Sequence, residues 1–169
     1  MKTKLLLAFM LTTLFAFAQK EAEQTIVKSS LAPILAYGEP ITLEVAKKIV
    51  NAAHTFAITN QWTVAIAIVD TGGNLVLFEK MENTQIGSIE VAMGKSRTAN
   101  NFKRPTKVFE DVVANGGSGL RVLAIPGVFP IEGGDPIIVN GKIIGAIGVS
   151  GMSSTQDEEV VKAGLAALK

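Results

Sequence analysis

The chain contains one histidine, His54, and no cysteine. Imidazole nitrogen is a common ligand for iron and other transition metals in proteins. On a helical wheel through residues 43–59, His54 lies about 180° from Val45, on the side away from the apolar stripe. We therefore expect His54 to face solvent or a second subunit. It is either an iron ligand in a pocket at a subunit interface or an ordinary surface histidine.

Basic and aromatic side chains gather between residues 95 and 106. Arginine binds carboxylates through two parallel hydrogen bonds, and an aromatic ring can lie against a planar ligand. This pattern predicts a site for a small anionic ligand; the alternative is a solvated basic face with one or two interface residues. The candidate residues are Lys95, Arg97, Phe102, Lys103, Arg104 and Thr106.

The carboxylate side chains are weaker candidates for iron binding or acid–base catalysis. Glu79 and Glu82 have a spacing that can attract iron at a surface, but without histidine we favour ordinary surface acids. Asp70 is expected to cap its own turn rather than to act as a base. The sequence contains no set of nucleophile, base and orienting residue, no phosphate-binding loop and no complete metal site. We therefore predict no catalytic residues and favour a binding protein over an enzyme.

Residues 1–18 have the pattern of a secretory signal peptide. Lys2 and Lys4 precede an apolar run, which ends in the small residues of a cleavage site at Ala18. The run is too short for a transmembrane helix. We therefore expect a periplasmic or secreted protein that has no stable membrane insertion after cleavage. Residues 19–39 are interpreted as an N-terminal extension.

The composition of the mature chain narrows the classes of partner. Removal of the signal peptide changes the formal net charge from +1 to −1 and leaves 151 residues, enough for one domain, which we place at residues 40–169. The absence of a charge excess argues against a nucleic-acid partner. Without cysteine the chain can form no disulfide, thiolate site or iron–sulfur site, so its stability must come from packing or from oligomerisation.

Hydrophobic periodicity and turn residues predict two hairpins with helices before, between and after them. Short hairpin connections argue against a parallel sheet. The expected class is therefore α+β, with an antiparallel sheet covered by helices. The predicted helices are residues 43–59 with Thr42 as the N-cap, 86–100, 107–115 and a C-terminal helix capped by Ser154 or Thr155; the predicted strands are 62–69, 75–78, 120–124 and the two sides of the Asn140-Gly141 turn.

Several short segments, in the same order and spacing, resemble the GlcG/HbpS-type haem-binding family, which is related to the C-terminal domain of PduO-type proteins. The resemblance spans about residues 40–169. One departure is Asn74, where some relatives have histidine. The matching segments are Val69–Leu75, Gly94–Ala99, Gly133–Ile137, Ile144–Gly151 and Gln156–Glu158.

The resemblance implies a fold, a ligand and an assembly. The fold is profilin-like, an antiparallel five-stranded sheet flanked by helices, often in homo-oligomers. The ligand is haem or a related tetrapyrrole, with a role in haem handling or sensing. His54 would bind the iron, and Lys95, Arg97, Phe102, Arg104 and Thr106 would contact the rest of the cofactor. A haem-degrading enzyme, an enzyme acting on a small organic acid and a non-catalytic interaction module remain alternatives.

Overall fold

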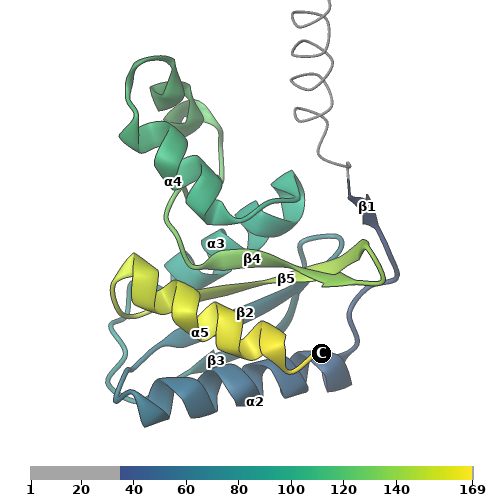
Figure 1. Ribbon diagram of the computed structural model, residues 1–169. Helices are drawn as coiled ribbons and strands as arrows, with labels where there is room; N and C mark the ends of the chain where they lie inside the picture. The colour runs from purple at the N-terminus through teal and green to yellow at the C-terminus, as the bar shows by residue number, and fades with distance from the viewer. Residues whose placement is uncertain (1–34, 169) are drawn as a thin grey trace, which may run out of the picture. The chain divides into compact units, whose positions relative to one another are not determined.

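The computed structural model describes residues 35–168 (Figure 1). The predicted signal peptide at 1–18 and most of the predicted extension lie outside the described residues. Among residues 35–168, no helix combines the length and the apolar character needed to cross a bilayer.

Five strands form one sheet around β5. The edge strand β4 pairs with one side of β5, while β2 and the short β1 pair with its other side, and β3 extends the sheet beyond β2. The predicted antiparallel sheet is confirmed for four strands, but β1 runs parallel to β5, so the sheet is mixed. The strands are β1 (Ala36–Tyr37), β2 (Ala65–Asp70), β3 (Leu75–Lys80), β4 (Gly134–Val139) and β5 (Lys142–Ser150).

Helices cover both faces of this sheet (Figure 1). The α2 and α5 helices pack together on one face, and α3 lies on the other. A short helix α4 and the 3₁₀ helix η1 stand off the sheet between α3 and β4. The helices are α2 (Leu43–Thr59), α3 (Ser88–Phe102), α4 (Thr106–Ala114), η1 (Gly117–Ala124) and α5 (Ser154–Ala166).

The alternation of side chains along β2 explains the two layers. Ile66 and Ile68 belong to the large core beneath α2 and α5, whereas Ala65 and Ala67 pack against α3. Small residues on the α3 side permit close approach of the helix. A side chain at Gly148 of β5 would place its Cβ 2.2 Å from the carbonyl oxygen of Ala92 in α3.

The helix caps follow from short polar side chains. Thr42 caps α2 as predicted, and its hydroxyl accepts a hydrogen bond from the amide of Val45 at 3.3 Å. The cap of α5 is Ser153, so the prediction of Ser154 or Thr155 was wrong by at least one residue. The reason is a reciprocal capping box, in which Ser153 and Gln156 satisfy each other's backbone amides.

The segment from residue 106 to residue 131, which we call the arm, contains α4 and η1. The predicted strand at 120–124 was wrong, because η1 occupies these residues and folds back against α4. A Cβ at Gly119 would lie 2.0 Å from the carbonyl oxygen of Val112, so only glycine permits this approach. In the arm, η1 therefore packs against α4 instead of adding a strand to the sheet.

Candidate functional site

His54 lies on α2 and is half-exposed, with 35% of its side chain accessible. Its Nδ1 atom forms an ion-pair contact with the Glu79 carboxylate of β3. Glu79 lies opposite Ile66 in the β2–β3 register, and Ile66 faces α2. Because directly opposed residues share one face of a sheet, Glu79 also points toward α2. The register of the first hairpin thus brings a carboxylate to the histidine.

This contact decides which histidine nitrogen is available. A carboxylate at Nδ1 favours a proton there and leaves the lone pair of Nε2 free, which is the usual arrangement of a metal-binding histidine. Residues 35–168 contain no group of three or more acidic or histidine side chains that could hold a metal ion. A lone histidine of this kind can be the one protein ligand to an iron that a macrocycle already coordinates.

Arg97 is an exposed residue of α3 beside the turn between β2 and β3. Its Nε lies 3.4 Å from the carbonyl oxygen of Gly73. Within this turn the Asp70 carboxylate accepts hydrogen bonds from the amides of Gly72 and Asn74 at 2.8 and 2.9 Å. Asp70 is thus the turn cap that the sequence predicted, and the neighbouring Arg97 guanidinium keeps further N–H donors for a ligand.

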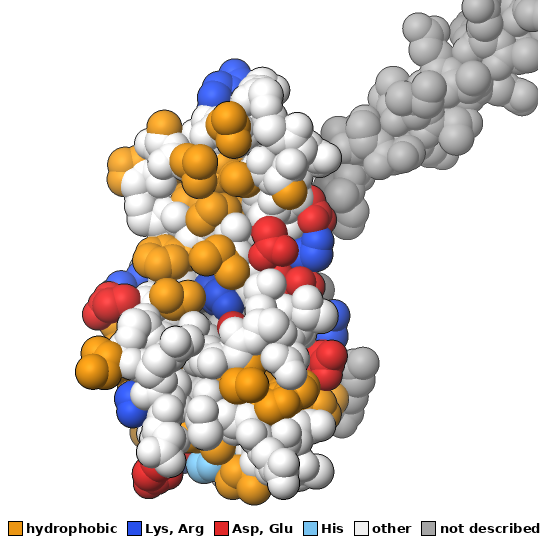
Figure 2. Space-filling model, turned by 90° about the vertical axis from the view of Figure 1, so that its left-hand side faces the viewer, with side chains coloured by type: hydrophobic (Ala, Val, Ile, Leu, Met, Phe, Trp, Pro, Cys, Tyr) orange, Lys and Arg blue, Asp and Glu red, His pale blue; other side chains and the backbone are white. Residues whose placement is uncertain are grey.

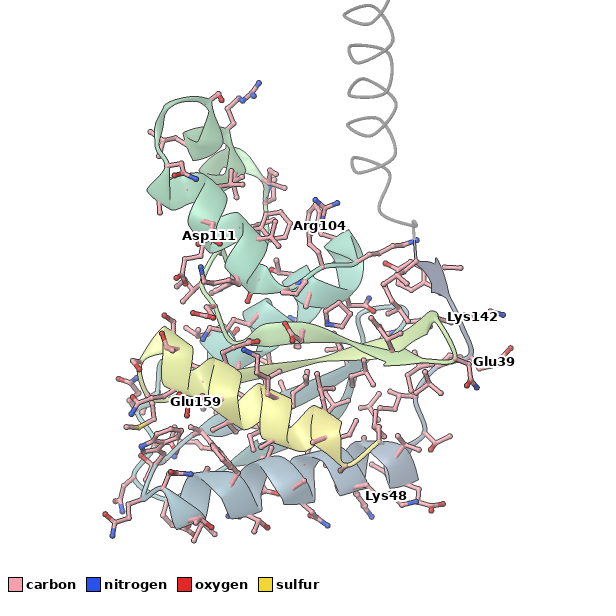
Figure 3. All side chains as sticks on the ribbon, viewed as in Figure 1. Glu39, Lys48, Arg104, Asp111, Lys142 and Glu159 are labelled. Carbon is pink, nitrogen blue, oxygen red and sulfur yellow. The ribbon has the colours of Figure 1, made fainter. Side chains whose placement is uncertain are left out.

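A cluster of rings and cations lies at the corner between α3 and α4. The rings of Phe102 and Phe109 meet edge to face with centroids 5.3 Å apart. Arg104 is exposed at this corner (Figure 3). Its Nε donates to the carbonyl oxygen of Phe102 at 3.0 Å, and its guanidinium lies 5.8 Å from the Phe109 ring centroid. The corner thus combines a positioned guanidinium with the half-buried Phe102 ring and the buried Phe109 ring.

The neighbouring Lys103 is engaged within the chain. Its ammonium donates to the carbonyl oxygen of Leu35 at 2.9 Å and lies 4.4 Å from the Tyr37 ring centroid. The Tyr37 hydroxyl donates in turn to the carbonyl oxygen of Asn100 at 2.7 Å. Lys103 therefore fastens β1 to the end of α3.

Lys95 does not join the surface cations. Its side chain is 1% exposed, and its ammonium donates to the Asp157 carboxylate at 2.8 Å and to the carbonyl oxygen of Val149 at 2.9 Å. Burial raises the pKa of the Asp157 carboxyl, and the adjacent Lys95 opposes that rise. Lys95 joins α3 to α5 and β5, so its ammonium is not presented to an external ligand.

Thr106 is also enclosed. Its hydroxyl accepts a hydrogen bond from the amide of Gly134 at 3.0 Å, which fastens the start of α4 to β4. Of the six predicted cofactor residues, the structure thus exposes His54, Phe102, Arg97 and Arg104 at least in part and buries Lys95 and Thr106.

A cleft of about 360 Å³ lies beside the corner. Ligand pockets commonly enclose about 300–1,000 Å³, so this cleft is at the low end of that range. A macrocycle held here would need further surface from another molecule. The lining residues are mostly apolar: Leu35, Lys103, Pro105, Asp135, Pro136, Ile138, Leu165 and Leu168.

The histidine and the arginines lie on different faces of the sheet. His54 belongs to α2, whereas Arg97 belongs to α3 on the opposite face. One copy of the chain therefore does not bring them around a single ligand. A single ligand could contact both only where two copies of the chain meet.

Sequence reasoning missed two contributors to these surfaces. The sequence pattern pairs Glu79 only with Glu82, whereas the β2–β3 register places it opposite Ile66, on the face that α2 covers. Phe109 was the second omission, and it lies on the apolar side of α4, against Phe102.

Comparisons with known proteins identify the family of this chain. Residues 41–166 match the model of a family described as haem-degrading protein HbpS-like. The chain belongs to the HbpS-like family. GlcG of Escherichia coli K12 is 37% identical to it over 110 residues, which cover 65% of this chain and 81% of GlcG.

Solved structures confirm the fold of this HbpS-like chain. The crystal structure of Klebsiella pneumoniae protein ORFY has a TM-score of 0.74 and 28% identity, and the match covers 82% of this chain and 97% of ORFY. A crystal structure of a PduOC–haem complex has a TM-score of 0.70 and 29% identity, covering 76% of this chain and 94% of PduOC. These matches confirm the expected α+β fold and the resemblance to the GlcG/HbpS group.

Proposed function

We propose that this protein is an exported haem-binding protein that handles or senses haem, with His54 as the iron ligand. The observation that carries the proposal is the half-exposed His54 whose Nδ1 contacts the Glu79 carboxylate. That contact leaves Nε2 free to bind iron. The HbpS-like family assignment and the relative crystallised with haem support the choice of ligand.

The haem propionates are assigned to Arg97 and Arg104, whose guanidinium groups are exposed. Guanidinium binds carboxylate with two hydrogen bonds, and the Phe102 ring beside Arg104 supplies apolar surface for the macrocycle. Because His54 lies on the other face of the sheet, the iron ligand and the propionate contacts come from different copies. The proposed site therefore requires a homo-oligomer.

Apolar residues of the arm support self-association. Six of the twelve large apolar side chains that are exposed among residues 35–168 lie on it, and Leu123 is 61% accessible. Figure 2 shows hydrophobic side chains gathered over the upper part of the molecule, where α4 and η1 lie. Contiguous exposed apolar surface of this kind is typical of an interface. The six residues are Val108, Val112, Leu120, Leu123, Ile125 and Ile131.

Titration with hemin tests the proposal. Purified tag-free protein should give a saturable Soret band that differs from that of free hemin. His54→Ala should shift this band or weaken binding at least tenfold. Lys47→Ala, an exposed change on the same helix, is the matched control and should behave as the wild type. Wild-type spectra that match free hemin would reject haem binding and favour an interaction module.

Haem degradation is the second candidate, because the description of the family names it. Bound haem supplies a redox-active iron that can activate oxygen when a reductant is present. Incubation of the haem-loaded protein with ascorbate and oxygen should then bleach the Soret band and release iron. A Soret band that is stable under these conditions would show that the protein binds haem without degrading it.

A further inference from the structure

Two carboxyl groups, Asp135 of β4 and Glu158 of α5, lie together at the junction of these elements. Glu158 is 6% exposed, although carboxylates are rarely so enclosed without a cation or several donors. The Oδ1 atom of Asp135 and the Oε2 atom of Glu158 are both enclosed, and neither accepts a hydrogen bond from a donor among residues 35–168. Each carboxyl thus keeps one enclosed oxygen without a donor.

A single proton can supply the hydrogen-bond donor that this pair of carboxyl groups lacks. Two ionised carboxylates are both acceptors, but protonation of either turns it into a donor for the other. The side chain of Glu158 lies within hydrogen-bonding reach of Asp135. A shared proton would therefore supply the pair with the donor that two ionised carboxylates lack.

The charged groups around the pair do not replace that proton. Lys162, on the same helix, contacts the other oxygen of Glu158, with Nζ 3.3 Å from Oε1, and it is 67% exposed. Glu132, which precedes β4, adds a further negative charge nearby. The buried Lys95 is already committed to Asp157. Lys103 lines the same cleft as Asp135, but its ammonium donates to the carbonyl oxygen of Leu35. The exposed Lys162 is therefore the cation that contacts this group of three carboxyls.

The acidity of the pair agrees with this geometry. Burial raises the pKa of Glu158 to about 7, and the adjacent Asp135 contributes to the rise. Burial also raises the pKa of Asp135. Both shifts favour the retention of one proton by the pair up to neutral pH.

We propose that Asp135 and Glu158 share one proton, and that this proton holds α5 against β4, next to the point where the arm joins β4. We call this contact the latch. The chain returns from the arm through Glu132, whose amide donates to the Glu110 carboxylate of α4, before it enters β4. Loss of the shared proton leaves two enclosed negative charges with no donor between them. Repulsion then loosens the α5–β4 contact above neutral pH.

Carboxyl-carbon NMR of the full chain tests the protonation directly. One carboxyl of the pair should remain protonated at pH 6 and lose its proton between pH 6.5 and 8, in the range where the pKa of Glu158 lies. Asp135→Asn should move the transition of Glu158 toward the ordinary range. Titration of both carboxyls below pH 5 in the wild type would overturn the proposal.

Hydrogen exchange of α5 and β4 amides tests the latch. After correction for intrinsic rates, opening should increase about tenfold between pH 6 and pH 8, because opening releases a proton only up to the folded-state pKa of Glu158, about 7. Glu158→Gln should abolish this increase, since its side chain carries no charge at either pH. Glu159→Gln, a change at the exposed neighbour on α5 (Figure 3), should retain it. Equal pH dependence in both variants contradicts the latch.

Discussion

Two ion pairs join helices to the rest of this protein, and they differ in exposure. Lys95 and Asp157 are 1% and 3% exposed, whereas His54 and Glu79 are each 35% exposed. In the enclosed pair the Lys95 ammonium donates to two acceptors within the chain, and removal of either charge leaves the other unpaired in the interior. In the half-exposed pair the carboxylate engages one ring nitrogen and leaves the second free. The first pair holds the fold, and the second suits ligand binding.

Removal of the lysine from the enclosed pair should have the largest effect. Lys95→Met leaves the Asp157 carboxylate buried without its cation, and we expect a loss of about 3–5 kcal/mol in the free energy of unfolding. Urea denaturation at pH 7 measures it. Lys48→Met, at an exposed pair on α2 (Figure 3), is the control and should cost about 0.5 kcal/mol or less.

A double variant sharpens this result. Lys95→Met combined with Asp157→Asn removes both charges and should recover part of the lost stability, because no unpaired charge remains enclosed. If the single variant is as stable as the wild type, the enclosed pair does not hold α3 to α5.

Glu158 offers a comparison with its neighbour Asp157, since both are buried on α5 but only Asp157 contacts an enclosed cation. The pKa of Glu158 in the folded state, about 7, is above its ordinary value of 4.5. Folding therefore takes up protons between these values, and the stability from this group is complete below about pH 4.5 and lost as the pH rises through 7.

The corresponding measurement is thermal or urea unfolding across pH 5–8. Relative to Glu158→Gln, the wild type should lose about 2–3 kcal/mol over this range, from about 1.4 kcal/mol per unit of pKa. If the free energy of unfolding of the two proteins has the same pH dependence, ionisation of the Glu158 carboxyl does not destabilise the folded state.

The half-exposed pair should give the smallest effect on stability. His54→Ala removes a surface contact, which is worth about 0–1 kcal/mol. The same change should nevertheless reduce haem affinity at least tenfold, so denaturation and hemin titration of one variant separate the two roles. A stability loss comparable with that of Lys95→Met would place His54 among the structural residues instead.

Local signals accounted for most of the fold. The apolar stripe of residues 43–59 and the hydroxyl of Thr42 gave α2 and its cap, and the Asn140-Gly141 turn gave the β4–β5 hairpin. The strand expected at 120–124 failed because η1 depends on the approach of Gly119 to α4, a contact that strand propensity does not contain. β1 was missed because a strand of two residues is too short to show the alternation of apolar and polar residues that identifies a strand.

The candidate site was less accessible to sequence reasoning. The wheel position of His54 correctly placed it off the core, but its contact with Glu79 depends on strand register. Lys95 and Arg97 are two residues apart on one helix, yet the first is enclosed and the second exposed. Lys95 is enclosed because α3 packs against β4 and β5 and its ammonium reaches Asp157 of α5. Residue type alone does not reveal that packing.

Because the sequence contains a single histidine, isotope labelling tests the central claim most directly. Tag-free protein carrying ¹⁵N-histidine is loaded with ferric haem, and pulsed EPR then detects nitrogen coupled to the iron. The account predicts a ¹⁵N coupling of the size expected for an axial imidazole, assigned to His54 and absent in His54→Ala. Haem that is bound with no ¹⁵N coupling in the wild type would contradict it.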